Sequence, residues 1–382
     1  MLYYLHFLSG YGTGAETEIF KGLNVFQYIT FRSLAAGVTA FILCLIFGNR
    51  VIRRLVSLKL GQPIRTQEEV NRLHELHGAK AGTPTMGGTL LLGAVIVSTL
   101  LWARPTNPLV WLCLFTVFFL GGVGFVDDYL KVTKKSSDGI SSRLKFALQC
   151  LLAAVLTGYF LFDVCTQGQP WTAYAPFAKD PVINLPVVFP FVVPFLLAFT
   201  FYLFVIAGAS NAVNLTDGLD GLAAGCTATV AFAFAVLTYT AGNGKIATYL
   251  QIPYVSLSGE LAVVCMALVG ASLGFLWWNC HPARVFMGDT GSLAIGGLLG
   301  VIAISCKQEL LLALIGGVFV LEASSVILQV ASFKTTGKRI FKMSPIHHHF
   351  ELSGWKESTV IVRFWILSII FALLGLATLK LR

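Results

Sequence analysis

The sequence carries little charge. Asp, Glu, Lys and Arg make up 12% of its 382 residues, against about 25% in soluble proteins. Apolar residues make up 56%, and the mean hydropathy is +0.78. So few charges cannot cover the surface of a soluble protein, which excludes a soluble enzyme. Long polar tracts are also lacking and aromatic residues reach 13%, which excludes a disordered chain. The composition therefore indicates a chain embedded in a membrane.

Several motifs are missing as well. The eight cysteines show no CxxC spacing, which argues against a zinc site or a disulfide framework. There is no P-loop motif for phosphate. The first 25 residues lack a basic segment followed by an apolar one, so we expect no cleaved signal peptide. No internal repeat is visible, which leaves a transporter built from inverted repeats without support.

The sequence is rich in long apolar runs. A helix needs about 20 apolar residues to cross a bilayer. Ten candidate spans lie near residues 25–48, 84–103, 108–126, 146–164, 187–207, 222–241, 260–278, 290–306, 310–333 and 359–379. The sequence therefore predicts an all-α polytopic membrane protein, with residues 1–382 forming a single integral membrane domain.

The net charge of +9 marks one side of the membrane. Ten spans place both termini on the same side, and 18 of the 27 Lys and Arg residues fall in the loops of the opposite side. Those loops are residues 49–83, 127–145, 208–221, 279–289 and 334–358. The positive-inside rule makes them cytoplasmic and both termini periplasmic. The excess of basic residues is thus mainly a topology signal, and we expect no nucleic-acid partner.

Acids and histidines gather on the same predicted face. Acidic residues contribute little to membrane orientation, so topology does not require this arrangement. Six of the eight Asp and six of the seven His lie in the cytoplasmic loops: Asp127, Asp128, Asp138, Asp217, Asp220, Asp289, His74, His77, His281, His347, His348 and His349. Carboxylates, imidazoles and cations on one face predict that the chemistry occurs there.

Two motifs place carboxylates at the ends of spans. Asp127 and Asp128 close the third span, and adjacent carboxylates at a membrane boundary need a metal, a proton or a cation. Lys131 lies one helical turn beyond Asp127 and is able to face it. Asp289 opens the eighth span. Its carboxylate is able to bind Mg²⁺ there, or the free amides of the helix N-terminus are able to bind a phosphate. Each motif also has an alternative interpretation. Asp127 and Asp128 would then only form the charged end of a helix, and Asp289 or Thr290 would only cap the N-terminus of the eighth span.

Three further segments are candidates for the site. In residues 211–221, polar side chains recur every three residues, which predicts a ligand-binding loop or caps of the sixth span by Asp217 or Asp220. Residues 344–351 hold three adjacent histidines, of which one or two are expected to point inward. Residues 80–88 include Lys80, which is able to meet a phosphate. Glu322 lies within the ninth span, where an acid is either functional or paired inside the bundle.

Together and in this order, the motifs resemble those of the polyprenyl-phosphate N-acetylhexosamine-1-phosphate transferases. The residues that carry the resemblance are Lys80 to Gly88, Asp127-Asp128, Asn211 to Gly221, Phe286 to Gly297 and Pro345 to Glu351. The last run is the most specific, and it is similar to the phospho-N-acetylmuramoyl-pentapeptide transferases of bacterial cell-wall synthesis. The resemblance covers nearly the whole chain, including the plan of ten spans.

The resemblance implies a reaction and its setting. UDP-N-acetylmuramoyl-pentapeptide and undecaprenyl phosphate would give lipid I and UMP. The resemblance also implies Mg²⁺, a site on the cytoplasmic face of the bacterial inner membrane, contact with membrane lipid, and a homodimer. Phosphoryl transfer depends mainly on positioning and charge neutralisation, which suits cations beside carboxylates. Direct attack by the lipid phosphate and prior attack by an Asp both remain open.

The expected site residues follow from the matched motifs. Asp289 is expected to bind Mg²⁺, Asp127 to act on the lipid phosphate, and Asp128 to support it or approach the metal. Asn214 and Asp217 are expected to position uridine or metal, while Lys80, Lys131 and His347 stabilise phosphate charge. The catalytic set is thus Asp127, Asp128, Asp289 and His347. The substrate-binding set is Lys80, Thr85, Lys131, Asn211, Asn214, Asp217, Asp220, Asn279, Phe286, His348 and His349.

Three rival functions remain at this stage. A sister transferase would pass N-acetylglucosamine-1-phosphate to a polyprenyl phosphate, but residues 345–351 argue against it. An intramembrane prenyltransferase should carry two aspartate-rich motifs of the DxxxD kind, which are missing. A transporter would place ionisable groups near the bilayer midplane, where the sequence puts only Glu322.

Overall fold

A computed structural model describes residues 1–10, 22–58, 82–134, 139–167, 169–187 and 192–380. Its main elements are α2 (Ile29–Ser57), α4 (Gly88–Trp102), α5 (Pro108–Lys134), α6 (Ser142–Thr166), β1 (Trp171–Ala173), β2 (Ile183–Leu185), α7 (Val192–Thr216), α8 (Leu222–Ala241), α9 (Gly244–Leu250), α10 (Leu261–Asn279), α11 (Gly288–Ser305), α12 (Glu309–Ile315), α13 (Gly317–Thr336), α14 (Ile346–Glu351) and α15 (Glu357–Ala377). Short 3-10 helices are η1 (Leu2–Gly10), η3 (Leu23–Gln27), η5 (Ser258–Glu260) and η6 (Thr378–Lys380). The predicted all-α polytopic fold is confirmed.

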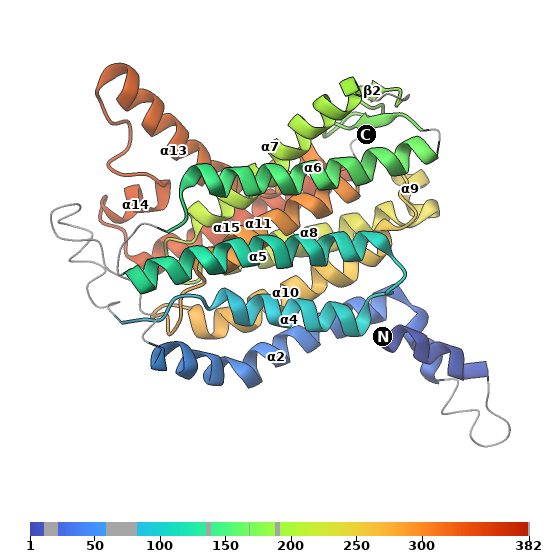
Figure 1. Ribbon diagram of the computed structural model, residues 1–382, viewed down its shortest axis with the longest axis horizontal. Helices are drawn as coiled ribbons and strands as arrows, with labels where there is room; N and C mark the ends of the chain where they lie inside the picture. The colour runs from blue at the N-terminus through green and yellow to red at the C-terminus, as the bar shows by residue number, and fades with distance from the viewer. Residues whose placement is uncertain (11–21, 59–81, 135–138, 168, 188–191, 381–382) are drawn as a thin grey trace.

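The helices form one bundle around α11. This helix is rich in small residues and almost wholly buried. It packs against α5 and α7. Beside it, α10 packs against α2 and α8 (Figure 1). Glycines allow these helices to approach closely, as is common in membrane bundles. Both chain ends lie at the end of the bundle that carries the β1–β2 hairpin. The N-terminal amine bonds to the carbonyls of Leu100 and Leu101 there, and Lys380 lies over the Tyr249 ring.

Nine helices among the described residues are long and apolar enough to span a membrane. The predicted second span is the exception, because α4 has only 15 residues. Its predicted first residues, 84–87, are not helical: Met86 has a positive φ, and the amides of Gly87 and Gly88 donate to the carbonyls of Phe286 and Met287. Pairing with a distant segment, which apolar content does not reveal, shortens this helix.

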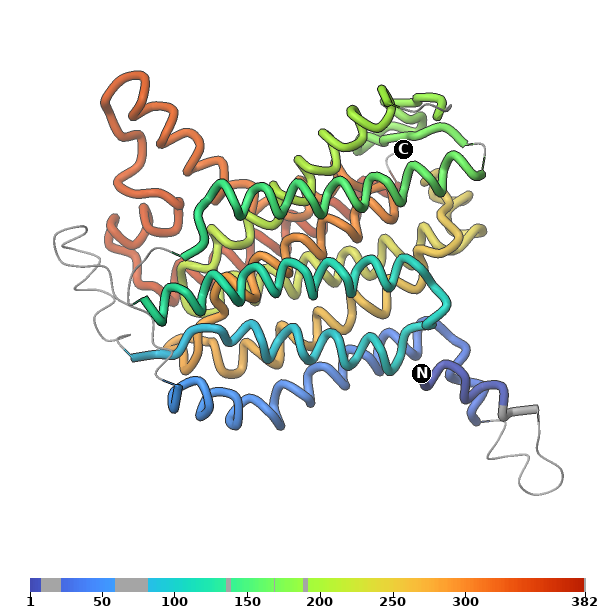
Figure 2. The backbone as a smooth tube through the Cα atoms, in the orientation of Figure 1, coloured from blue at the N-terminus to red at the C-terminus, as the bar shows by residue number. Residues whose placement is uncertain are grey.

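Four other predicted spans have clearly different boundaries. The first continues from residue 48 to Ser57, the third from residue 126 to Lys134, and the fifth from residue 207 to Thr216. The predicted ninth span is divided at Gly316 into α12 and α13. The tube in Figure 2 follows α13 as it leaves the bundle at an angle, with α14 beside it at the end opposite both termini. The motif-bearing ends of α5, α7 and α11 also lie towards that end.

Candidate active site

Asp127 and Asp128 lie within the last turns of α5, not in a loop beyond it. Both are buried, with 1% and 3% of their surface exposed. The Lys131 ammonium is 2.7 Å from Asp127 Oδ2, which confirms that the two face each other one turn apart. An i,i+4 ion pair and basic residues in the final turn both stabilise a helix C-terminus. These interactions account for the extra turns of α5.

Asp128 binds the N-terminus of α11. Its carboxylate accepts hydrogen bonds from the amides of Asp289 (3.1 Å) and Thr290 (2.9 Å), and from the Thr290 hydroxyl (2.8 Å). A carboxylate also interacts favourably with the positive end of the helix dipole. The alternative role of Asp289 or Thr290 as an N-cap is not what the structure shows, because no side chain of α11 caps it. The cap comes from α5.

Gly124 lets α5 approach the first turn of α11. A Cβ at this position would lie 2.2 Å from the Asp289 carbonyl oxygen, and that atom belongs to the backbone. Only a glycine permits this separation without a shift of one helix. The two carboxylates of α5 therefore reach Asp289 because the sequence has Gly124 one turn before them.

We expect Gly124→Ala to destabilise the protein by about 1–3 kcal/mol, the usual cost of overpacking. Thermal unfolding in detergent measures this as a lower melting temperature. Gly93→Ala is the matched control, because a Cβ at residue 93 of α4 would meet no atom within 4 Å. Equal melting temperatures for the two variants would contradict the close approach of α5 and α11.

Three carboxylates and two ammonium groups form the centre of the site. One oxygen from each of Asp127, Asp128 and Asp289 lies within 4.8 Å of the others. Asp289 Oδ2 is 3.1 Å from Lys131 Nζ and 2.9 Å from Lys145 Nζ. Lys145 Nζ is also 3.4 Å from Asp127. Lys145 is not among the residues predicted for the site. It lies directly before the predicted fourth span, on the same predicted face of the membrane as Asp127, and this position is the feature of the sequence that indicates it.

The polar residues of the segment 211–221 have different partners. Residues 211–216 are helical rather than a loop, since α7 ends at Thr216. The Asn214 amide donates to Asp289 Oδ1 (2.8 Å) and to the Ser292 hydroxyl (2.9 Å), so it lies within the carboxylate cluster. The Asn211 amide instead donates to Gln149 of α6 and to the Ala207 carbonyl. Asn211 therefore holds α7 to α6 and does not reach the carboxylates.

Asp217 lies beside the cluster and accepts a hydrogen bond from the Gly288 amide at 3.1 Å. Burial raises the pKa of Asp217 well above its usual range, and the negative charges of Asp289 and Asp128 raise it further. A nearby cation would favour the ionised form of this carboxyl.

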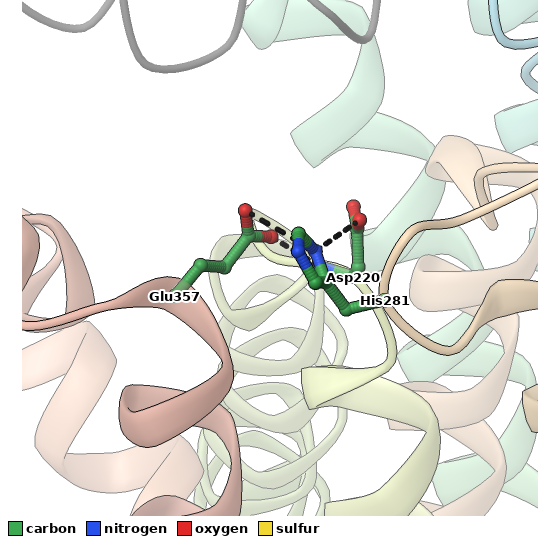
Figure 3. A group of neighbouring side chains, drawn as sticks. All are labelled: Asp220, His281 and Glu357. Carbon is green, nitrogen blue, oxygen red and sulfur yellow. Dashed lines mark hydrogen bonds and ion pairs between the residues drawn. The ribbon is translucent and has the colours of Figure 1, made fainter.

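Asp220 belongs to a second group with His281 and Glu357 (Figure 3). Asp220 Oδ2 is 3.0 Å from His281 Nδ1 and accepts the Ala283 amide, while the Asp220 amide donates to Glu357. The alternative role of Asp217 or Asp220 as a cap of the sixth span is wrong, because Gly221 precedes α8 and no side chain caps this helix. The group joins the 280–287 segment to the start of α15.

The three histidines of α14 differ in position. His347 is fully buried, and its Nδ1 is 3.0 Å from Glu322 Oε2 of α13. His348 pairs with Glu351 on the same short helix, and His349 accepts the Lys342 amide near the surface. The expectation that one or two would point inward is confirmed for His347. Glu322 is paired inside the protein, which was one of its two predicted roles.

Two comparisons identify the chain's relatives. Residues 110–307 match the family described as glycosyl transferase family 4. The chain is also 52% identical over 382 residues, the full length of both proteins, to a protein named phospho-N-acetylmuramoyl-pentapeptide-transferase from Methylacidiphilum infernorum (isolate V4). The chain belongs to glycosyl transferase family 4. The part that matches family 4 contains the carboxylate cluster and Asp220, and His347 lies outside it.

The remaining predicted residues surround the start of α11 in this family 4 protein. Thr85 is buried near Gly288: a Cβ at Gly288 would lie 2.8 Å from the Thr85 hydroxyl and 2.6 Å from an Asp128 oxygen. The Phe286 amide donates to the Pro84 carbonyl, and the Asn279 side chain donates to the Val285 carbonyl. These contacts hold the segment before α11. Lys80, His74 and His77 lie outside the described residues.

The donor set of the family 4 cluster fits a hard divalent cation. Mg²⁺ prefers oxygen ligands and is commonly held by one or two carboxylates with water and substrate phosphates. In the described part of the chain, the oxygens of Asp289 and Asp127 are met by ammonium and amide groups and lie close to one another. Both oxygens of Asp128 already bind α11. The first two carboxylates are thus the better candidates for a cation.

Proposed function

We propose that this chain transfers phospho-N-acetylmuramoyl-pentapeptide from its UDP-linked donor to undecaprenyl phosphate, giving lipid I and UMP. The observation that carries the proposal is the cluster of Asp127, Asp128 and Asp289 with two lysines at one end of a membrane bundle. The name of the full-length relative supports the choice of substrates. A lipid substrate and a water-soluble one meet at a membrane surface, which suits a site at the end of the spans.

The reaction requires one phosphate to approach another. An oxygen of the lipid phosphate attacks the phosphorus that bears the sugar, and the bond from that phosphorus to the UMP oxygen breaks. Lys131 and Lys145 neutralise the phosphate oxygens, and Asp127 orients the lipid phosphate or accepts its proton. Asp128 holds α11 so that Asp289 and Asn214 keep their positions. Bound Mg²⁺ would neutralise charge on the diphosphate, with Asp289 as its main ligand.

Lys145 offers a test in which two measurements change in opposite directions. Lys145→Met keeps the apolar stem but removes the ammonium that lies 2.9 Å from Asp289. We expect the rate of UMP release to fall about 10–100-fold, while Mg²⁺ binds more tightly because a competing cation is gone. Steady-state kinetics over a Mg²⁺ titration measure both. Lys245→Met is the control, since Lys245 lies in α9, at the end of the bundle opposite α14. Weaker Mg²⁺ binding in Lys145→Met would contradict the proposed competition.

The setting is part of the proposal. Residues 1–382 form one integral membrane domain in the bacterial inner membrane, with the carboxylate cluster facing the cytoplasm and both termini in the periplasm. The Lys and Arg bias of the loops supports this orientation. We further propose a homodimer, following the resemblance; the mass of the purified protein in nanodiscs tests it. Labelling of single cysteines placed at residues 2 and 284 tests the orientation.

The deciding experiment supplies the purified protein with Mg²⁺, undecaprenyl phosphate and one UDP-sugar at a time. We expect UMP only with UDP-N-acetylmuramoyl-pentapeptide. Release of UMP with UDP-N-acetylglucosamine would favour the sister transferase, and no UMP with any donor would reject the proposal. Trapping a phospho-sugar intermediate on the enzyme would exclude direct attack by the lipid phosphate.

A further inference from the structure

Glu322 and His347 form a pair that is sealed from solvent. Both residues have 0% of their surface exposed, and His347 Nδ1 lies 3.0 Å from Glu322 Oε2. Glu322 comes from α13 and His347 from α14, so the pair spans two elements. A carboxyl inside a membrane-spanning helix is costly, and such groups are usually paired and functional. Packing α14 against α13 does not itself require a carboxyl.

The other ring nitrogen of His347 lacks a partner. Nε2 is buried and has no hydrogen-bond partner among the described residues. A buried polar atom without a partner is costly, so native proteins rarely keep one unless a ligand or water meets it. The unpaired atom therefore marks a position where a further group is expected.

The unpaired nitrogen lies against the segment that leads to the carboxylate cluster. A Cβ at Gly218 would be 2.3 Å from Nε2, so the edge of the imidazole touches this glycine. The preceding residue, Asp217, accepts the amide of Gly288 at the start of α11. Nε2 therefore lies on the side of the ring that faces residues 217–218, next to the cluster, while Nδ1 lies beside Glu322.

We propose that Glu322 is a positioning residue for the transfer reaction: its carboxylate accepts a hydrogen bond from Nδ1–H of His347, fixes the tautomer and ring orientation, and leaves Nε2 free to act in the transfer. The role of the pair in turnover rests on the proposed function. With Nδ1–H held by a carboxylate, protonated Nε2 donates to a phosphate oxygen and unprotonated Nε2 accepts a proton. In either state Nε2 is the nitrogen that acts. A carboxylate orienting a histidine in this way is known from serine proteases.

Kinetics of UMP release provide the first test. Glu322→Gln removes the charge and allows the amide to donate to Nδ1, which selects the wrong tautomer. We expect kcat to fall about 100-fold or more with little change in KM, because the analogous change in a serine protease has a large effect on kcat. Glu322→Asp should recover part of the loss, since it restores a carboxylate. Glu309→Gln is the matched control: Glu309 is also buried, follows the far end of α11, and should keep wild-type kcat.

A double variant separates positioning from simple stabilisation. If Glu322 acts only through His347, then Glu322→Gln with His347→Ala should be no slower than His347→Ala alone. Losses that multiply would overturn the proposal, as would wild-type kcat in Glu322→Gln. Thermal unfolding of each variant shows whether lost activity is lost protein; if Glu322→Gln does not fold, Glu322→Asp carries the comparison.

NMR of protein labelled with ¹⁵N-histidine tests the geometry without turnover. We expect the neutral His347 ring to carry its proton on Nδ1 in the wild type and to lose this preference in Glu322→Gln. A proton on Nε2 of the neutral wild-type ring would overturn the proposal. If the wild type released no UMP with any donor, the proposed function would fail, while this measurement would still decide how Glu322 orients His347.

Discussion

Replacing Asp289 with asparagine is expected to lower UMP release by about 10²–10³-fold while the protein stays folded. Asp289 is the residue at which the two lysines and the Asn214 amide converge. Losing its charge removes the proposed metal ligand and leaves the ammonium groups of Lys131 and Lys145 with one shared carboxylate, that of Asp127, in place of two. The loss of one group that stabilises charge in a transition state commonly has an effect of this size. Asparagine keeps the shape and one acceptor oxygen, so the first turn of α11 should remain in place.

The matched control for this prediction is Asp180→Asn, an exposed aspartate between β1 and β2. It should leave both the rate and the melting temperature unchanged. Near-normal turnover in Asp289→Asn, with an unchanged melting temperature, would remove Asp289 from the site. A large fall in melting temperature would instead show that the charge matters mainly for folding.

The sequence predicts the spans well because apolar length is a local property. Its errors have tertiary causes. Residues 84–87 are predicted to begin the second span, yet the Pro84 carbonyl and the Gly87 amide pair with Phe286, some 200 positions away. Likewise, α5 continues past residue 126 because Lys131 neutralises Asp127, which a hydropathy average treats as two charges that end a span.

The site could be predicted only in part for the same reason. The face and the carboxylates follow from the chain order, but their partners depend on how helices pack. Asp128 is expected from the sequence to support Asp127 or approach a metal, and only the packing of α5 on α11 shows that its oxygens bind the amides of α11. Asp220 shares the spacing of Asn214 and Asp217 and yet lies with His281, since α7 ends before it. Lys145 resembles any basic residue at a membrane boundary until α6 brings it to Asp289.

Removal of divalent cations is expected to abolish UMP release, and added Mg²⁺ should restore it. Both substrates are polyanions, and Lys131 and Lys145 supply two positive charges against three carboxylates. The cluster is therefore short of positive charge even before a substrate phosphate arrives. A divalent cation held by Asp289 and Asp127 would supply this charge.

Two readouts together locate the cation at the cluster. Mg²⁺ binds only the folded protein in this scheme, so it should raise the wild-type melting temperature in a saturable way. The increase should disappear in Asp289→Asn and persist in Asp180→Asn. Undiminished UMP release in excess chelator would refute the need for a metal. An equal increase of the melting temperature in Asp289→Asn would instead show that the cation binds elsewhere. The group of Asp220, His281 and Glu357 would then be tested next, because its ligand atoms also lie within 4.8 Å of one another.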